Sequence, residues 1–453
     1  MIDVLELAKA ALLISTNQRL TRAAFEQRQL KRFRSFAAYA LAHSPYYGRI
    51  MREQGIDPSS CTPQQFPVLT KTDVLRNFDE IVTEREISLR GIQEFLERSH
   101  NPMERYLGRY TVIHTSGTSG QVGYFVFDPK AWARGIAQVA NTPSLGFIPR
   151  RKRLAFVGPT DGHYAGISMT GSVRFSPFNL LYTGRFFEIN VPLATVVEGL
   201  NAFQPDVLVS YGSVLESLAE KQMEGVLKIH PRMITNSAEP IPLSCREAIE
   251  KGFGPCLRNL YACSEHLCVG IREARFDSMR MIEDDLIFEF YDDHTLVTNL
   301  FNRVLPLIRY RMNDVLRPIE SSVYGPYRAA TEAVGRVEQD AKFVNRHGDL
   351  DRISQYMIIE LMIPGVRRFQ LKITGPASFT LAIVLDPWAT EQDRDGAIAA
   401  ATARLNGILA QKEMDNVVFT IAPVADIPVD SRTQKFKLIV DETVAASGMG
   451  SGA

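Results

Sequence analysis

The first sixty residues carry apolar side chains at helical spacing, with the densest run over residues 25–41. Apolar positions that recur every three to four residues predict helices. Residues 43–47 (His-Ser-Pro-Tyr-Tyr) interrupt this pattern. Residues 67–75 then predict a turn that leads into a short helix, with either Thr70 or Thr72 as its N-terminal cap.

Short apolar runs alternate with helical stretches between residues 109 and 237. The expected strands are 109–114, 122–127, 153–158, 186–189, 207–210 and 233–235, and the expected helices are 131–139, 193–203 and 214–225. This alternation is typical of an α/β fold in which helices cover a mixed, mostly parallel sheet. Ligands of such sheets bind at the carboxyl ends of the strands, where residues 211–213, 237–240 and 261–265 fall.

Beyond residue 265 the pattern becomes richer in strands, which are expected at 286–291, 295–299 and 307–311. A smaller α+β unit begins near residue 339. Its expected elements are the strands 367–374, 378–385 and 417–421 and the helix 391–411. We therefore expect two domains, a large one over residues 1–336 and a small one over residues 337–453.

Composition narrows the function class. The 453 residues carry 51 basic and 51 acidic side chains, so the formal net charge is zero. A neutral chain gives no electrostatic reason to expect a nucleic acid or an anionic membrane as partner, and no apolar run reaches the ~18 residues of a membrane span. Five cysteines in a chain of this length suit a reducing cytoplasm without a disulfide framework. Asp3 and Glu6 near the N-terminus favour a helix over a signal peptide.

Cys263, His266 and Cys268 lie close enough in sequence to suggest a zinc site. Their spacing fits no standard pair of two-ligand clusters, and buried free thiols are common. We therefore expect no metal at these three residues.

The stretch from His114 to Asp128 carries the clearest chemical signal. Hydroxyl side chains and glycines gather there between two apolar strands, at Thr115, Ser116, Gly117, Thr118, Ser119 and Gly120. Glycine lets the backbone approach an anion closely, and backbone N–H and hydroxyl groups donate to phosphate oxygens. An ordinary polar hairpin is the alternative interpretation. No lysine follows Gly120, so this is not the phosphate loop of the common nucleotide triphosphatases, and a cation must come from elsewhere.

Further motifs follow this loop in order along nearly the whole chain. They are Ser237-Ala238-Glu239-Pro240, Tyr261-Ala262-Cys263-Ser264-Glu265, residues 308–314 (Ile-Arg-Tyr-Arg-Met-Asn-Asp) and residues 335–338 (Gly-Arg-Val-Glu). In these motifs the chain resembles the adenylate-forming superfamily of acyl-CoA ligases, and within it the phenylacetate–CoA ligase and CapK-like branch. Residues 43–47 and 67–73 also resemble this branch.

The resemblance implies a role for each motif. Ser116, Thr118 and Ser119 would hold the β- and γ-phosphates of ATP. Glu265 would bind Mg²⁺, since magnesium takes carboxylate oxygens and bridges ATP phosphates, and Asp314 would accept hydrogen bonds from the ribose. The other members of the expected nucleotide site are Thr115, Gly117, Gly120, Ser237, Ala238, Glu239, Tyr261, Ser264 and Arg336. Taken singly, Glu265 is also compatible with a solvated loop carboxylate and Asp314 with a strand-end turn.

The missing cation has a candidate near the C-terminus. In the family, a lysine of the small domain within an Arg-[Ser/Thr]-x-x-Gly-Lys motif reaches the substrate carboxylate and the α-phosphate. Residues 431–437 match this motif best with Lys435 in the lysine position. The glycine is absent and the loop is one residue shorter, so Lys437 and a plain basic turn stay open as alternatives. The hinge position between the domains, usually aspartate, is Glu338.

Five residues are candidates for the acid pocket: His163, Tyr164, Gly166, Tyr211 and Ser213. The first three lie in an expected loop over residues 159–168. A pocket with rings and few charges suits an aromatic or short apolar carboxylic acid. Each of the five is equally compatible with a core or rim position.

The resemblance implies an ATP-dependent acid–thiol ligase. The acid would form an acyl-adenylate, and a thiol would then displace AMP to give a thioester. The expected cofactors are ATP, Mg²⁺ and coenzyme A, on a cytoplasmic monomer or homodimer. One alternative transfers the acyl group to the phosphopantetheine of an acyl carrier protein or to another nucleophile. The other, from a different class, is a nucleotide-binding protein without catalysis.

Overall fold

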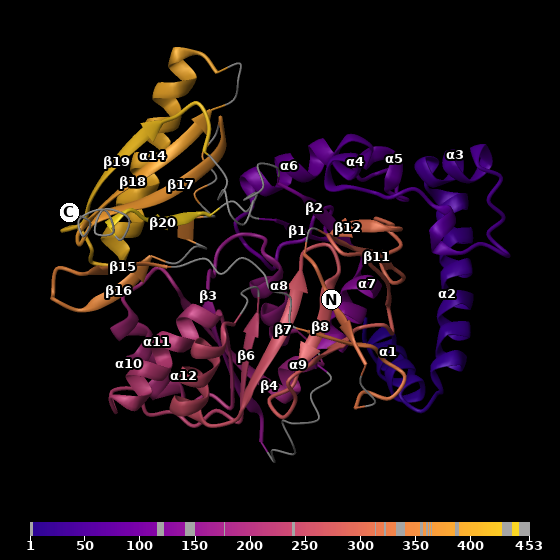
Figure 1. Ribbon diagram of the computed structural model, residues 1–453, viewed down its shortest axis with the longest axis horizontal. Helices are drawn as coiled ribbons and strands as arrows, with labels where there is room; N and C mark the ends of the chain where they lie inside the picture. The colour runs from indigo at the N-terminus through magenta and orange to yellow at the C-terminus, as the bar shows by residue number, and fades with distance from the viewer. Residues whose placement is uncertain are drawn as a thin grey trace, which may run out of the picture. The chain divides into compact units, whose positions relative to one another are not determined.

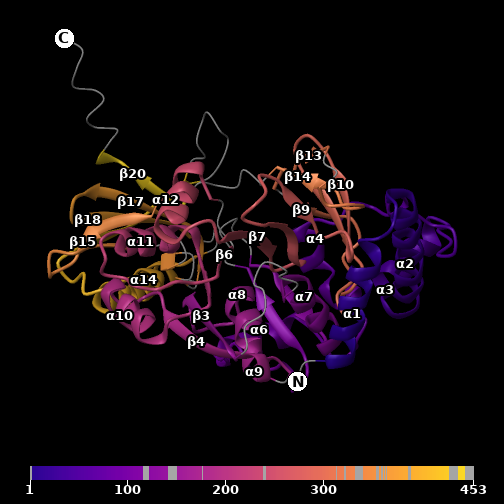
Figure 2. The same cartoon turned by 90° about the horizontal axis from the view of Figure 1, so that it is seen from below.

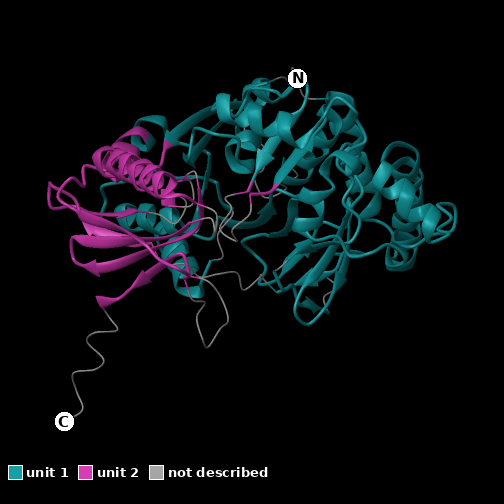
Figure 3. Ribbon diagram, turned by 90° about the horizontal axis from the view of Figure 1, so that it is seen from above, with its two compact units in different colours: residues 1–114, 124–187, 200–335 teal, residues 115–123, 188–199, 336–453 magenta. Residues whose placement is uncertain are grey.

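A computed structural model describes most of the chain (Figure 1). The described residues are 3–115, 122–140, 150–175, 177–237, 241–312, 314–320, 323–331, 340–353, 357–358, 361, 363, 365–385, 389–427 and 437–443. The chain divides into two compact units, coloured teal and magenta in Figure 3. The first unit comprises residues 1–114, 124–187 and 200–335, and the second unit comprises residues 115–123, 188–199 and 336–453.

Helices open the first unit, as the helical pattern of the first sixty residues predicts. They are α1 (Val4–Asn17), α2 (Arg22–His43), α3 (Pro45–Glu53), α4 (Lys71–Arg76), α5 (Phe78–Ile81) and α6 (Leu89–Arg98). Ser44 separates α2 from α3 and caps α3 by accepting a hydrogen bond from the Tyr47 N–H. Thr70 and not Thr72 caps α4, since its hydroxyl accepts from the Asp73 N–H while the Asp73 carboxylate accepts from the Thr70 N–H.

A large sheet runs through the first unit. Among the described residues its nine strands follow the order β13-β14-β9-β8-β7-β6-β5-β3-β4. Their bounds are β3 (Lys152–Gly158), β4 (Tyr182–Glu188), β5 (Val207–Ser210), β6 (Met233–Ser237), β7 (Leu257–Cys263), β8 (Leu267–Arg272), β9 (Met279–Met281), β13 (Pro318–Ile319) and β14 (Ala329–Ala330). The sheet is parallel over β3, β5, β6 and β7 and antiparallel from β7 to β13. The expected α/β class with mixed sheets is confirmed.

Helices cover this sheet. They are α7 (Pro129–Ala140), α8 (Ala165–Gly171), α9 (Phe178–Leu181), α10 (Leu193–Phe203), α11 (Gly212–Met223) and α12 (Leu243–Phe253). α11 and α12 pack on each other and contact β6 and β7 respectively, while α7 contacts β8 and α8 contacts β3 (Figure 2). These contacts bury the apolar faces of the strands, which is why the parallel strands read as continuous apolar runs in the sequence.

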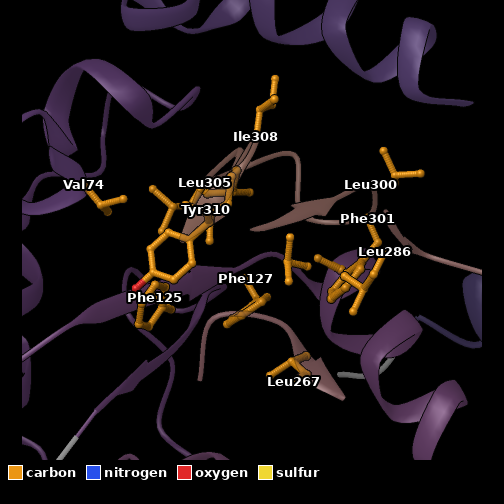
Figure 4. Packing of buried hydrophobic residues seen from close by; sticks show 14 of the residues in the cluster. Val74, Phe125, Phe127, Leu267, Leu286, Leu300, Phe301, Leu305, Ile308 and Tyr310 are labelled. Carbon is orange, nitrogen blue, oxygen red and sulfur yellow. The ribbon is translucent and has the colours of Figure 1, made fainter. Parts of the chain in front are cut away.

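The main hydrophobic core of the first unit gathers around two further β elements. These are the hairpin β1 (Thr111–His114) with β2 (Tyr124–Phe127), and a sheet of β10 (Leu286–Phe290), β11 (Thr295–Asn299) and β12 (Tyr310–Met312). Phe125 and Phe127 from β2 meet Leu267, Leu305 and Tyr310 in this core (Figure 4). The core therefore joins the strand that leaves the expected phosphate loop to β12, which lies within the motif of residues 308–314.

A buried acidic turn, residues 283–285, ties helices of the first unit together. Asp285 is fully buried, and its carboxylate pairs with Arg32 of α2 at 2.7 Å and with Arg134 of α7. Gln138 of α7 donates to the same carboxylate at 2.8 Å. Burial alone would raise the pKa of Asp285, but Arg134 and Arg32 outweigh burial and hold that pKa below its ordinary value of 3.8.

The C-terminal part of the second unit is a small α+β structure. Its elements are β15 (Ala341–Val344), β16 (Leu350–Ile353), β17 (Val366–Gly375), β18 (Ser378–Leu385), α14 (Glu391–Gln411), β19 (Val418–Pro423) and β20 (Ile439–Asp441). The sheet order is β19-β18-β17-β20, and Thr390 caps α14. Lys412, at the end of α14, and Asp351 of β16 form a buried ion pair at 3.1 Å.

Several expected bounds are wrong in detail, among them the strand expected at 186–189, which spans Tyr182–Glu188. The expected loop over residues 159–168 ends at Tyr164, because α8 begins at Ala165. Gly166 is therefore helical, and the burial of Ile167 and Ser168 holds this helix in place. The strand expected at 307–311 begins only at Tyr310. In the part of the chain that the structure describes, none of the helices has the length and hydropathy to span a membrane.

Candidate active site

The parallel strands bring several expected site residues to one edge of the large sheet. These are His163 and Tyr164 after β3, Tyr211 and Ser213 after β5, Ser237 at the end of β6 and Tyr261 near the end of β7. Because the carboxyl ends of neighbouring parallel strands share an edge, the segments that follow them lie close together. The outcome supports the placement expected from the sequence.

Many expected residues lie outside the described residues, so their structure is left aside: Ser116, Gly117, Thr118, Ser119, Gly120, Ala238, Glu239, Arg336, Glu338 and Lys435. The described ends of the expected phosphate loop are Thr115 and Gly123. The Thr115 N–H donates to the Gly123 carbonyl at 2.9 Å, and the Gly123 N–H donates to Thr115 Oγ1 at 2.8 Å. These two bonds continue the antiparallel ladder in which His114 pairs with Tyr124.

Glu265 lies in the turn between β7 and β8. A register shift between Tyr261 and Ala262 disturbs the ladder just before this turn, and such irregularities re-aim side chains near functional sites. Leu267, at the end of the turn, has a φ of 63°, a value that few residues with a side chain adopt. The Ser264 hydroxyl donates to the His114 carbonyl at 3.4 Å, so the turn touches the strand that enters the expected phosphate loop.

Two tyrosine–acid hydrogen bonds join residues 261–265 to residues 310–314. The hydroxyl of Tyr261 donates to Oδ2 of Asp314 at 2.7 Å, and the hydroxyl of Tyr310 donates to Oε1 of Glu265 at 3.1 Å. In each stretch the acid follows the tyrosine by four residues (261 to 265 and 310 to 314), and each tyrosine binds the acid of the other stretch. We refer to these four residues as the crossed tyrosine–acid pairs.

The surroundings of the crossed pairs shift their pKa values. Loss of solvent around the carboxylate raises the pKa of Glu265 above the ordinary 4.5. Lys71 and the Tyr310 hydroxyl oppose that rise. Burial and Asp314 raise the pKa of Tyr261 well above 10.0, and burial and Glu265 raise that of Tyr310. Both tyrosines therefore remain protonated hydrogen-bond donors at neutral pH.

The segment before α4 is pinned to β12. Leu69 and Tyr310 form a parallel bridge, in which the Leu69 N–H donates to the Arg309 carbonyl at 3.1 Å and the Arg311 N–H donates to the Leu69 carbonyl at 2.9 Å. Arg309 has a φ of 52° at this point, and its guanidinium binds both carboxylate oxygens of Glu289 at 2.9 Å. The bidentate pair holds the strained backbone against which the segment docks.

This docking brings Lys71 to the site, although the sequence interpretation gave it no role. Lys71 is the first residue of α4, two positions beyond Leu69. Its ammonium group interacts electrostatically with Glu265, while burial lowers its pKa below the ordinary 10.5. Lys71 is therefore a second candidate for the cation that the expected phosphate loop lacks. The signal in the sequence was its place in residues 67–73, which resemble the same branch of ligases.

His163 is held by structural contacts. Its Nε2 lies 3.0 Å from the Ser99 hydroxyl, which donates to the Glu104 carboxylate at 2.6 Å. Since that hydroxyl proton is directed at Glu104, the Ser99 oxygen accepts from Nε2–H. Burial lowers the pKa of His163 to about 4, so the ring is neutral at pH 7. The Tyr164 ring lies 4.6 Å from the His114 ring, beside the start of the expected phosphate loop.

The donor set fits Mg²⁺ that arrives with ATP. In the described part of the chain, no group of three or more His, Cys, Asp or Glu side chains is arranged to hold a metal ion. Magnesium is commonly held by one or two carboxylates together with substrate phosphates. Glu265, with one carboxylate oxygen bound by Tyr310, suits this mode. His266, which the sequence placed near two cysteines, accepts a hydrogen bond from Asn299 at Nδ1, at 3.4 Å.

Comparison with curated proteins gives three relatives, while no family model matches the chain. Protein CapK from Staphylococcus aureus is 24% identical over 299 residues, which cover 63% of this chain and 61% of CapK. Phenylacetate-coenzyme A ligase from Pseudomonas putida is 24% identical over 343 residues, 69% of this chain and 71% of the ligase. The Escherichia coli enzyme of the same name is 25% identical over 320 residues, 64% and 66% of the two chains. The matches to CapK and the Escherichia coli enzyme thus span less than two thirds of those proteins.

Solved structures match over a greater length. A 2-hydroxyisobutyryl-CoA ligase in complex with 2-HIB-AMP and CoA in the thioesterification state superposes with a TM-score of 0.59 at 18% identity, over 95% of this chain and 93% of that one. The same ligase in the postadenylation state gives a TM-score of 0.55 at 20% identity, over 95% and 93%. The chain has the fold of the adenylate-forming acyl-CoA ligases. The expected resemblance to the phenylacetate–CoA ligase and CapK-like branch is confirmed by the similarity of the chain to CapK and to two phenylacetate-coenzyme A ligases.

Proposed function

We propose that this protein is an ATP-dependent acid–thiol ligase that joins a carboxylic acid to coenzyme A through an acyl-adenylate. The observation that carries the proposal is the pair of acids in the crossed tyrosine–acid pairs. Glu265 and Asp314, the expected metal and ribose ligands, lie 49 residues apart and accept hydrogen bonds from the buried Tyr310 and the partly buried Tyr261 respectively. The fold that carries these two acids is that of a ligase whose structures hold an acyl-AMP and CoA.

The chemistry requires positioning and charge neutralisation more than a protein nucleophile. A carboxylate oxygen of the acid attacks the α-phosphorus of ATP, the bond from that phosphorus to the bridging oxygen breaks, and pyrophosphate leaves. The thiol sulfur of coenzyme A then attacks the acyl carbon, AMP leaves, and the thiol proton passes to solvent. Mg²⁺ bound with ATP would neutralise phosphate charge, and Glu265 would hold it.

The chain's own residues would divide the work. Asp314 would bind the ribose, and Thr115 with the loop that follows it would donate to the β- and γ-phosphates. Lys71 would add positive charge near Glu265. In the proposal, residues 337–453 form a lid that moves on a hinge at Glu338 and carries Lys435 to the α-phosphate during adenylation.

The proposed acid is aromatic or short and apolar. Tyr164, Tyr211 and Ser213 follow β3 and β5 at the sheet edge that carries Tyr261, and rings with few charges suit such a substrate. Two of the curated relatives are phenylacetate-coenzyme A ligases, which supports an aromatic acid. We place His163 behind this pocket, since Ser99 and Glu104 fix its ring.

ATP–pyrophosphate exchange over a panel of acids tests the proposal. We expect exchange to depend on one class of acid and on a divalent cation, and coenzyme A to release AMP and form a thioester. Release of AMP only with an acyl carrier protein would replace coenzyme A by that acceptor. Binding of ATP without exchange for any acid of the panel, with Glu265 and Asp314 intact, would contradict catalysis and favour a nucleotide-binding protein.

A further inference from the structure

Tyr310 lies within the motif of residues 308–314, but the family resemblance gives its side chain no role. We propose that Tyr310 is the positioning residue of the metal site: its hydroxyl holds Oε1 of Glu265, so that the carboxylate presents Oε2 to a divalent cation bound with ATP. This inference rests on the proposed function. It means that a tyrosine of β12 sets the orientation of a carboxylate 45 residues away in the sequence.

Tyr310 is able to hold a fixed position because its ring is confined on several sides. The ring is buried in the core of the first unit beside Phe125 (Figure 4). The Phe125 and Tyr310 rings pack edge to face with centroids 6.5 Å apart, and the His266 ring packs edge to face at 5.7 Å. The backbone of Tyr310 is paired with Val297 on one side and bridged to Leu69 on the other. Because the ring of this donor is already fixed by packing, forming its hydrogen bond costs little additional side-chain entropy.

The residue that follows Glu265 reinforces this arrangement. His266 is fully buried, and the side-chain amide of Asn299 donates to its Nδ1 at 3.4 Å and to the Glu265 carbonyl at 3.5 Å. The Asn299 oxygen accepts from the backbone N–H groups of Phe301 and Asn302, both at 3.0 Å. One buried amide therefore fixes the backbone of Glu265 and the ring that packs on Tyr310. Support of this kind is typical of groups that orient a metal ligand.

The consequence for the carboxylate is a division between its two oxygens. A carboxylate with two free oxygens can bind a cation with both, whereas an oxygen that accepts from a tyrosine has part of its capacity used. Magnesium demands near-octahedral geometry and keeps several waters and phosphate oxygens, so one protein oxygen suits it well. Tyr310 thus commits Oε1 of Glu265 to a hydrogen bond and fixes the direction of the carboxylate, to which the Cys263 side chain also donates.

The test separates metal binding from nucleotide binding by calorimetry. The quantity measured is the metal enhancement, defined as the dissociation constant of β,γ-imido-ATP in EDTA divided by the constant in Mn²⁺. AMP is titrated in parallel, because AMP lacks the β- and γ-phosphates that the metal bridges. Tyr310→Phe removes only the hydroxyl and keeps the ring that packs on Phe125 and His266. Tyr261→Phe is the matched control, because it removes the hydroxyl of the other crossed pair, on the ribose side.

We expect Tyr310→Phe to lower the metal enhancement by about ten-fold or more, the range found when a partner of a metal ligand is removed, while the AMP dissociation constant changes less than about two-fold. Tyr261→Phe should weaken AMP and β,γ-imido-ATP by the same factor and leave the metal enhancement unchanged. The linewidth of the Mn²⁺ electron paramagnetic resonance signal in the ternary complex should change for Tyr310→Phe alone.

Two outcomes would overturn the inference at different levels. An unchanged metal enhancement in Tyr310→Phe, with full enhancement in the natural protein, would overturn the role of Tyr310 and leave the proposed function standing. A natural protein that binds the nucleotide without any metal enhancement would overturn the metal site at Glu265, and the role of Tyr310 with it. Equal loss of AMP and metal-dependent binding in Tyr310→Phe would show a structural role and also overturn the inference.

Discussion

The hydroxyl of Tyr261 and the carboxylate of Asp314 are joined by a 2.7 Å hydrogen bond, although 53 residues separate them in sequence. The bond orients Asp314 through Oδ2 and leaves its other oxygen for a ligand. A charge-assisted hydrogen bond of this length is stronger than one between neutral groups. The position of the expected ribose acceptor is therefore set by β7, while the residue itself belongs to the stretch after β12.

This relationship makes a prediction about the ribose. Asp314→Ala should weaken the binding of AMP and of ATP by the same factor, about ten- to one-hundred-fold. The reason is that a hydrogen bond to a charged group is worth about 1.5–3 kcal/mol. Pyrophosphate, which has no ribose, should bind as it does to the natural protein. Isothermal calorimetry with the three ligands measures this. Unchanged AMP binding, or a loss that includes pyrophosphate, would contradict the assignment of Asp314.

Glu265→Gln tests the metal role. Glutamine keeps the size of the side chain but removes the negative charge that a hard cation prefers. We expect pyrophosphate exchange to fall by orders of magnitude at saturating Mg²⁺ while AMP affinity stays within about two-fold. Because the folded protein raises the pKa of this carboxyl, the charged form is unfavourable for folding at neutral pH, and the variant should melt at the same temperature or higher. Full exchange with unchanged dependence on Mg²⁺ would refute the role.

Lys71→Met tests the second candidate cation. Methionine keeps the length and removes the charge, so binding of ATP and pyrophosphate should weaken by at least about ten-fold while AMP binding stays unchanged. Lys71→Arg should restore part of the loss, because it returns the charge without the compact ammonium. Lys31→Met, which removes an exposed lysine of α2, is the control and should leave all three affinities unchanged. If Lys71→Met weakened AMP binding as much as ATP binding, Lys71 would not act on the polyphosphate.

The sequence predicted the scaffold of this site better than its internal contacts. Strand 207–210 and helix 193–203 were expected with the bounds they have in the structure, because each is a regular pattern whose apolar face packs locally. Glu265 and Asp314 were identified because they close recognisable motifs. The roles of Tyr310 and Lys71 were missed, since they depend on how Leu69 pairs with β12. A pairing between segments 241 residues apart leaves no periodic trace in either of them.

The buried acidic turn at residues 283–285 is a second feature that the sequence pattern does not predict, and it concerns stability. Three adjacent acidic side chains are rarely buried, and no prediction was made from the sequence for Glu283, Asp284 and Asp285. In the structure all three are buried, and arginines of α2 and α7 neutralise Asp285. Nothing in the local pattern announces such a cluster, since its partners are 151 and 253 residues away.

Asp285→Asn should destabilise the fold by about 3–5 kcal/mol at pH 7, because two partly buried guanidinium groups lose the charge of the fully buried carboxylate. The folded protein lowers the pKa of Asp285 below 3.8. Its contribution to stability is therefore full above the unfolded pKa and is lost as the pH falls through the folded one. The difference in unfolding free energy between variant and natural protein should be constant from pH 6 to 8 and shrink below about pH 3.8. Urea unfolding at several pH values measures it.

The control for this prediction is Glu94→Gln, which removes the partner of Arg90 in an exposed ion pair. Exposed pairs contribute little, about 0–1 kcal/mol, so this variant should stay close to the natural protein at every pH. A small effect of Asp285→Asn at pH 7, or a difference that grows in acid, would contradict the account of the buried pair.

The last prediction separates the two half-reactions through Lys435. The expected phosphate loop carries no lysine, so the charge that develops at the α-phosphate needs a cation from outside the loop, and a lysine on a hinged lid can be brought in for adenylation and withdrawn afterwards. Lys435→Ala should therefore nearly abolish pyrophosphate exchange, yet form thioester from synthetic acyl-adenylate and coenzyme A at close to the natural rate. Lys437→Ala is the matched control and should change neither rate. The Lys437 carbonyl already accepts a hydrogen bond from Gln370 of β17 at 2.7 Å, which ties this residue's backbone to the small sheet. Exchange that survives in Lys435→Ala, or that is lost in Lys437→Ala instead, would move the role to Lys437 or to Lys71.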